Sequence, residues 1–268
     1  MESAELKQIL LSAVNASISA GVEILKIYKS DFEVELKDDN SPLTIADKKS
    51  NDIIYDALAS FEIPFLSEEG KEIPYDERKK WDYLFIIDPL DGTKEFVKKN
   101  GEFTVNIALV NKDKPILGVI YSPVSGELFF SLNDFGVYKK TAFKNFSDLK
   151  LLLYDAIELP KKDERSKYII VGSRSHMSKE TQAFFEKKKN EYEEVEILAI
   201  GSSLKICMVA EGKADIYPRY APTMEWDTAA GHAIANMAGF KVLKYQSNEE
   251  IKYNKKSLLN PWFLVTKN

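Results

Sequence analysis

A mixed α/β fold is predicted, with an α+β N-terminal half built on a mostly antiparallel sheet and an α/β C-terminal half. Apolar residues recur at three- and four-residue steps over residues 4–30. Short β-branched and aromatic runs, divided by Gly, Pro, Asn and Asp, fill residues 65–139. After residue 168, strand-like and helix-like segments alternate. We expect a metal-binding half over residues 1–145 and a substrate-binding half over residues 146–268.

Two helices are predicted to open the chain. The stripe over residues 4–30 is typical of an amphipathic helix with one buried face. A second stripe begins near Thr44 and ends before Pro64, and its first turn contains Asp47.

The strands that follow are predicted from their composition and from the turn residues between them. In the N-terminal half we expect strands at residues 65–66, 83–87, 103–110, 116–121, 128–131 and 137–138. A charged segment at 161–167 interrupts this pattern. Beyond it we expect strands at residues 168–171, 195–198, 214–217 and 241–243, and helices that start near Ser178, Ser202 and Asp227.

Composition excludes several classes of protein and of site. A net charge of -5 argues against binding of nucleic acid polymers, which draws on clustered basic surface. Cys207 is the only cysteine and there are two histidines, so a cysteine-based zinc cluster and an internal disulfide are excluded and any metal would be held by oxygen. We found no apolar run near the roughly 20 residues that span a bilayer, and we expect a cytoplasmic protein.

The most informative motif is Asp-Pro-Leu-Asp-Gly-Thr at residues 88–93, which follows an apolar strand. Pro89 removes a backbone donor and Gly92 permits a tight turn, so two carboxylates and the Leu90 carbonyl are available together. Mg²⁺ prefers such oxygen ligands. Asp-Pro and Asp-Gly pairs are also common in plain turns, and the motif alone leaves both explanations open.

Two further acids lie in comparable places. Glu68 follows the predicted strand at 65–66, and Asp227 opens a predicted helix after Trp226. Singly, each has a structural explanation, as a solvated loop acid or a helix N-cap. Like charges near 4 Å apart cost on the order of 4 kcal/mol per pair at an effective dielectric of about 20, so a cluster of these acids requires cations.

These motifs together resemble the inositol monophosphatase superfamily, whose members are Mg²⁺-dependent, lithium-sensitive phosphatases. The resemblance rests on Ser-Glu-Glu at 67–69, the motif at 88–93 and Trp-Asp-Thr-Ala-Ala-Gly at 226–231. It implies a layered αβαβα sugar-phosphatase fold and two or three Mg²⁺ ions. It further implies that Asp47 and Thr93 position or activate the attacking water, and that the metal ligands are Glu68, Asp88, Leu90 through its carbonyl, Asp91 and Asp227. The sequence alone favours helix capping as the role of Asp47, and the two roles are compatible.

Other segments resemble the 3'(2'),5'-bisphosphate nucleotidases of the CysQ type. They are Lys-Glu-Phe at 94–96, residues 100–106, Gly-Ser-Ser-Leu-Lys at 201–205 and Tyr-Pro-Arg at 217–219. The implied substrate is a small phosphorylated nucleotide, and the implied pathway is sulfur metabolism. A bisphosphate needs a second anion site, which Ser202, Lys205 and Arg219 could form unless they are a cap and surface charges. The predicted substrate-binding residues are Glu68, Asp91, Gly92, Thr93, Lys94, Ser175, His176, Ser202, Lys205, Arg219 and Asp227.

Two other functions compete with this hypothesis. An inositol or sugar-phosphate monophosphatase would use the same metals, and a catalytically silent magnesium- or nucleotide-binding regulator would keep the fold. The complete acidic set together with Thr93 disfavours the regulator. The sequence leaves the oligomeric state open.

Overall fold

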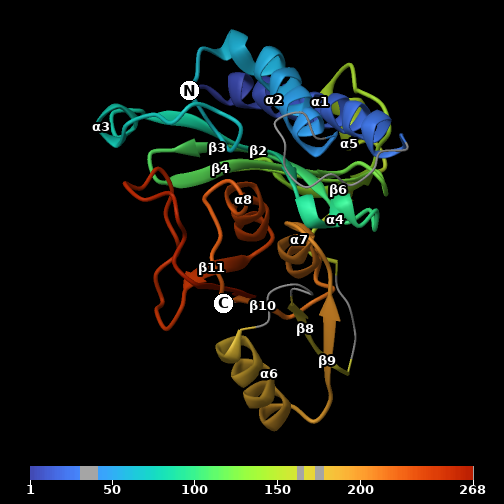
Figure 1. Ribbon diagram of the computed structural model, residues 1–268, viewed down its shortest axis with the longest axis vertical. Helices are drawn as coiled ribbons and strands as arrows, with labels where there is room; N and C mark the ends of the chain where they lie inside the picture. The colour runs from blue at the N-terminus through green and yellow to red at the C-terminus, as the bar shows by residue number, and fades with distance from the viewer. Residues whose placement is uncertain (31–41, 162–165, 173–177, 268) are drawn as a thin grey trace.

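The computed structural model describes residues 1–30, 42–161, 166–172 and 178–267 as five layers (Figure 1). Two long helices cover one face of the first sheet, two shorter helices lie between the sheets, and a last helix covers the second sheet. The α/β class and the αβαβα layering are therefore confirmed. The helices are α1 (Ser3–Tyr28), α2 (Pro42–Leu58), α3 (Tyr75–Arg78), α4 (Thr93–Val97), α5 (Leu149–Leu153), α6 (Lys179–Glu191), α7 (Leu204–Glu211) and α8 (Ala229–Met237), with a 3-10 turn η1 at Ala59–Phe61.

The first sheet has seven strands in the order β1-β2-β3-β4-β5-β6-β7. Only β1 and β2 pair in parallel, and each later strand is antiparallel to its neighbour, as the sequence predicts. Its strands are β1 (Phe65–Ser67), β2 (Tyr83–Asp91), β3 (Thr104–Asn111), β4 (Lys114–Ser122), β5 (Glu127–Leu132), β6 (Gly136–Thr141) and β7 (Ile157–Glu158).

The second sheet has five strands in the order β11-β12-β10-β8-β9. Strand β8 pairs in parallel with β9 and β10, and β12 is antiparallel to β10 and β11. Strand β12, a short apolar run that follows Pro261, was not predicted. The strands are β8 (Tyr168–Gly172), β9 (Val195–Ala199), β10 (Ile216–Arg219), β11 (Phe240–Lys244) and β12 (Phe263–Lys267).

Two hydrophobic cores hold the layers together. One lies between the α1–α2 pair and the first sheet, and the other between the two sheets around α7 and α8. Helix α8 packs on β3 and β4 although it follows them far along the chain. The first sheet also continues to β7, past residue 145, and the proposed division into halves at 145/146 stays a prediction.

Helix α1 is long and apolar enough to cross a membrane by length and composition, contrary to the expectation that no segment would be. Within the apolar window, 56% of the residues are buried inside the fold. Ile9, Leu10, Val14 and Ile18 contribute to the core against the first sheet, so the apolar character of the helix is explained by packing.

Candidate active site

A β-bulge at the end of β2 turns two aspartates toward one face of the sheet. Asp88 pairs with Asn106 on β3 and Asp91 pairs with Thr104, so three steps on β2 match two on β3. Without the extra residue, positions three apart on a strand would point to opposite faces. The hydroxyl of Ser50 on α2 donates to the Pro89 carbonyl at 2.7 Å and holds the bulge.

Parallel pairing brings Glu68 to the same edge. Ser67 is in register with Ile87, so the residues that follow them, Glu68 after β1 and Asp88 within β2, lie side by side. The backbone N–H of Glu68 donates to the Ile87 carbonyl at 3.2 Å, which fixes the position of Glu68.

Asp227 arrives from the other half of the chain, immediately before α8. The residue at the N-cap position is Thr228, and the Asp227 carboxylate instead accepts the Met224 backbone N–H at 2.8 Å. Capping of the helix is therefore not what this side chain does in the structure. Its other carboxylate oxygen is available as a metal ligand beside the other acids.

Carboxylate oxygens of Asp88, Asp91 and Asp227 all lie within 4.8 Å of one another. Burial is the main cause, and the charge of Asp91 the next, that raises the pKa values of Asp227 and Glu68 to about 7 each. Burial also raises the pKa of Asp88 well above its usual range. Glu68 as a whole is exposed, so water screens its charge more than the others. A crowded set of oxygen donors that resists ionisation fits a divalent cation, which would supply the missing positive charge.

The two predicted water-positioning residues flank this cluster. Asp47 lies buried on α2, where burial and then the charges of Glu69 and Glu68 raise its pKa to about 8. Thr93 is the first residue of α4, and Gly92 at its N-cap has φ 97°. A Cβ at Gly92 would meet the Glu102 carbonyl oxygen at 3.1 Å, so glycine is needed there for both conformation and space.

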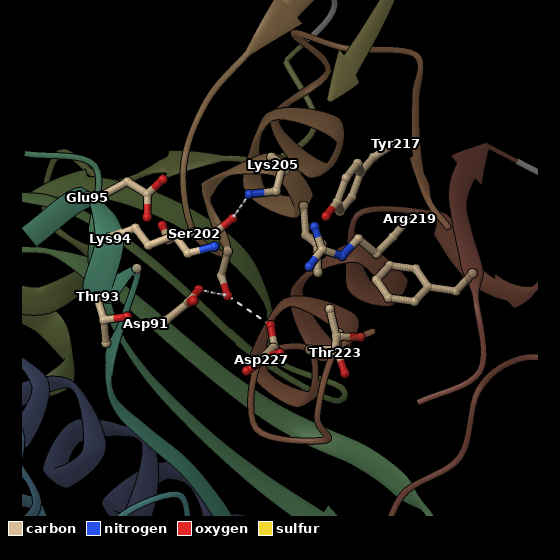
Figure 2. Close-up of a pocket in the computed structure, with 15 residues that line it drawn as sticks. Asp91, Thr93, Lys94, Glu95, Ser202, Lys205, Tyr217, Arg219, Thr223 and Asp227 are labelled. Atoms are coloured by element: carbon tan, nitrogen blue, oxygen red, sulfur yellow. Dashed lines mark hydrogen bonds between the residues drawn. The ribbon is translucent and has the colours of Figure 1, made fainter. Parts of the chain in front are cut away.

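A cavity of about 240 Å³ extends from the acidic cluster into the C-terminal half (Figure 2). Asp91 and Asp227 lie toward one end of it, and Lys205 and Tyr217 toward the other. The predicted Asp91, Gly92, Thr93, Lys94, Ser202, Lys205, Arg219 and Asp227 all line it, together with Glu95, Ser203, Ile206, Tyr217, Thr223, Thr228 and Phe263, whereas Glu68 does not.

The predicted anion-binding residues occupy one part of the cavity wall. Ser202 has φ 49° and lies before the N-cap of α7, one residue earlier than its predicted place at a helix start. Lys205 is 6% exposed, and its ammonium donates to the carbonyls of Ile200 and Ser202. Burial lowers the pKa of Lys205 to about 8. Arg219 donates through Nη2 to the Pro222 carbonyl at 3.1 Å.

Ser175 and His176 lie outside the described residues, so their predicted part in the nucleotide pocket stays a prediction. Sequence reasoning missed Phe263, whose strand was not predicted, and Ser203. The run of aromatic and β-branched residues at 262–266 was a signal for the strand. No local pattern distinguished Ser203 from its neighbour Ser202.

The stability of the metal-free protein is expected to fall as pH rises from 6 to 8. Folded Asp47, Asp88 and Asp227 hold protons in this range that unfolded carboxyls, with pKa values near 4, have already lost. Because the folded state then binds more protons, the free energy of unfolding decreases with pH. Burial lowers the pKa of His232 and lowers that of Lys205 to about 8, and both groups give an opposite slope, but they are two groups against three.

Thermal unfolding followed by circular dichroism in excess chelator measures this slope. We expect a lower Tm at pH 8 than at pH 6, and recovery when Mg²⁺ is added at pH 8. A metal-free Tm that rises over this interval would show that the acids are ionised without a cation.

Comparison with known proteins places the chain among phosphatases. The sequence profile of the inositol monophosphatase family matches residues 5–265. The 3'(2'),5'-bisphosphate nucleotidase CysQ of Shigella flexneri is 40% identical over 252 residues, which cover 92% of this chain and 95% of that protein. The crystal structure of CysQ from Bacteroides thetaiotaomicron, at 50% identity, aligns with a TM-score of 0.92 over 97% of both chains.

An inositol monophosphatase from Anabaena (Nostoc) sp. PCC 7120 is less similar, with a TM-score of 0.70 and 25% identity over 98% of this chain and 92% of that one. The profile match spans every described acid of the cluster and the whole wall of the cavity. The chain belongs to the inositol monophosphatase family of metal-dependent phosphatases.

Proposed function

We propose that this protein is a Mg²⁺-dependent 3'(2'),5'-bisphosphate nucleotidase. It hydrolyses the 3'-phosphate of 3'-phosphoadenosine 5'-phosphate, or of its 5'-phosphosulfate, to AMP or adenosine 5'-phosphosulfate and phosphate. The observation that carries the proposal is a single cavity that joins the acidic cluster to a separate cationic pair, Lys205 and Arg219. Similarity to the CysQ proteins, which are named for this activity, supports it.

The acidic cluster is the proposed site of two or three Mg²⁺ ions. When bound, they would neutralise charge on the phosphate oxygens and polarise the attacking water. The residues that would hold them are Glu68, Asp88, Leu90 through its carbonyl, Asp91 and Asp227. Because these residues come from β1, β2 and the segment before α8, the fold itself assembles the donor set.

Asp47 and Thr93 are proposed to prepare the water. The Thr93 hydroxyl orients it and passes its proton toward the Asp47 carboxylate, while the ester oxygen that leaves the phosphorus takes up a proton from solvent. Asp47 must be ionised for this role, and cations beside it would bring its raised pKa down. Gly92 and Thr93 also begin α4 and offer backbone N–H groups to a phosphate, beside Lys94.

The far part of the cavity is proposed to hold the phosphate that is not cleaved. Two buried polar atoms there, Ser202 Oγ and Arg219 Nε, have no hydrogen-bond partner in the described part of the chain. Buried polar groups are rarely left unsatisfied, so an anionic ligand is a reasonable partner for both. Lys205 adds a positive charge, because a bound anion would favour its protonated form.

Phosphate release by the wild type and by Lys205→Ala tests the proposal. The wild type should prefer 3'-phosphoadenosine 5'-phosphate to inositol 1-phosphate. Lys205→Ala should lower kcat/KM for the bisphosphate by about 10- to 150-fold, equivalent to roughly 1.5 to 3 kcal/mol for a charged hydrogen bond. Hydrolysis of inositol 1-phosphate should barely change.

Lys187→Ala is the matched control, because this lysine is exposed on α6 and pairs with Glu191 at 3.7 Å. It should leave both activities unchanged. Equal losses on the two substrates in Lys205→Ala, or a wild-type preference for inositol 1-phosphate, would favour an inositol phosphatase instead. We further propose a cytoplasmic location, in line with the expectation from the sequence.

A further inference from the structure

Ser203 lies between the two acids that the two halves of the chain contribute. It is 4% exposed and stands at the N-cap position of α7. Its hydroxyl oxygen is 2.8 Å from Asp91 Oδ2 and 2.9 Å from the backbone oxygen of Asp227. The side-chain nitrogen of Asn106 is 2.9 Å from the same hydroxyl.

The hydroxyl has one proton to give, and its neighbours decide where that proton points. Asn106 Nδ2 donates to the Ser203 oxygen, and Asn106 Oδ1 accepts the Thr104 hydroxyl at 2.9 Å. The Ser203 proton can therefore go only to Asp91 or to the Asp227 carbonyl. A carboxylate is the stronger and here the nearer acceptor, so the proton points to Asp91.

The chain of hydrogen bonds thus has one direction, from Thr104 to Asn106 to Ser203 to Asp91. Thr104 and Asn106 are buried on β3, in register with Asp91 and Asp88 of the bulge. Thr104 and Asn106 are two residues apart on β3 and therefore lie on one face of the sheet, where Asn106 reaches Ser203. The strand partners of the two bulge aspartates thus belong to the hydrogen bonds that support Asp91.

We propose that Ser203, held by Asn106, is a positioning residue that occupies one oxygen of the Asp91 carboxylate and aims the other at the metal. The inference rests on the proposed metal site. Groups behind a metal ligand fix its orientation and commonly change metal affinity or activity 10- to 100-fold when removed. Ser203 is suited to this task because its hydroxyl makes no capping hydrogen bond to α7.

Binding of Mn²⁺ alone, followed by the electron paramagnetic resonance of the free ion, tests the proposal without turnover, since Mn²⁺ shares the oxygen preference of Mg²⁺. Ser203→Ala should weaken binding by about 10- to 100-fold. In an activity assay, the Mg²⁺ concentration for half-maximal rate should rise, and excess Mg²⁺ should restore most of the rate. A variant whose metal site is intact would keep the wild-type Mg²⁺ concentration for half-maximal rate.

Folding of the variant is expected, because Ser203 has helical φ and ψ of -68° and -7° that alanine adopts readily. Ser203→Gly removes the same hydroxyl and is measured in parallel. If one of the two variants does not fold, the other still tests the proposal. The matched control is Ser131→Ala on β5, another buried serine, whose hydroxyl has no partner in the described residues. It should bind Mn²⁺ as the wild type does.

A double-mutant cycle with Asn106→Leu tests whether Asn106 acts on the metal site through Ser203. If Asn106 acts through Ser203, the double variant should bind Mn²⁺ no more weakly than Ser203→Ala does. Wild-type affinity in Ser203→Ala, or losses that multiply in the double variant, would overturn the proposal. Failure of the wild type itself to bind Mn²⁺ would instead overturn the proposed function.

Discussion

Asp91→Asn is expected to lower the rate of phosphate release about a thousandfold or more while the fold persists. The substitution keeps the shape of the side chain but removes one charge from the group of acids within 4.8 Å of one another. A charge about 4 Å from a cation is worth roughly 4 kcal/mol per unit charge at an effective dielectric of about 20. Each 1.36 kcal/mol in the barrier is about tenfold in rate.

Asp227→Asn should behave in the same way, because it removes a charge from the opposite side of the cluster. The metal-free stability of both variants should rise, since repulsion between the acids falls. Asp134→Asn is the matched control: this aspartate is exposed in the turn between β5 and β6, at φ 59°, where asparagine is well tolerated. Wild-type turnover in Asp91→Asn or Asp227→Asn would show that the cluster is not the catalytic site.

Removal of Mg²⁺ is expected to abolish activity. Because the clustered carboxylates of Asp88, Asp91 and Asp227 lie at one end of the cavity, they would repel a phosphate in the absence of cations. Phosphate release in excess chelator should fall to background and return on addition of Mg²⁺. Millimolar Li⁺ should inhibit, as the family resemblance implies.

Ca²⁺ added after chelation provides a control, because it binds oxygen ligands with longer distances and looser geometry and should not substitute fully. Full turnover in excess chelator would exclude a metal-dependent mechanism. It would also remove the reason for gathering the acids.

The sequence by itself determined the local structure and the chemical character of the site. Helix α2 follows from apolar periodicity and the strand predicted at 83–87 from its apolar run, both of which are properties of neighbouring residues, although β2 continues to Asp91. The tight turn before Thr93 follows from Gly92, which adopts the required φ without strain. The oxygen-only donor set follows from the scarcity of cysteine and histidine.

Features whose sequence signal is short or not local were not predicted. Strand β12 is a five-residue run whose role depends on partners β10 and β11, and with it Phe263 was missed. Ser202 and Ser203 are identical in local chemistry and both line the cavity, yet among the described residues the Ser202 hydroxyl has no partner whereas the Ser203 hydroxyl donates to Asp91. Only the orientation of the backbone before α7 separates them.

Tertiary structure decided which of the acids meet. Parallel pairing of β1 with β2 sets Glu68 beside Asp88, and the bulge turns Asp91 to the same face. Packing of α8 against β3 and β4 then carries Asp227 across from the second half of the chain. Strand pairing and helix packing depend on the burial of apolar faces that are distant in sequence. Residue spacing alone therefore identified these acids as candidate ligands but did not show which of them meet in space.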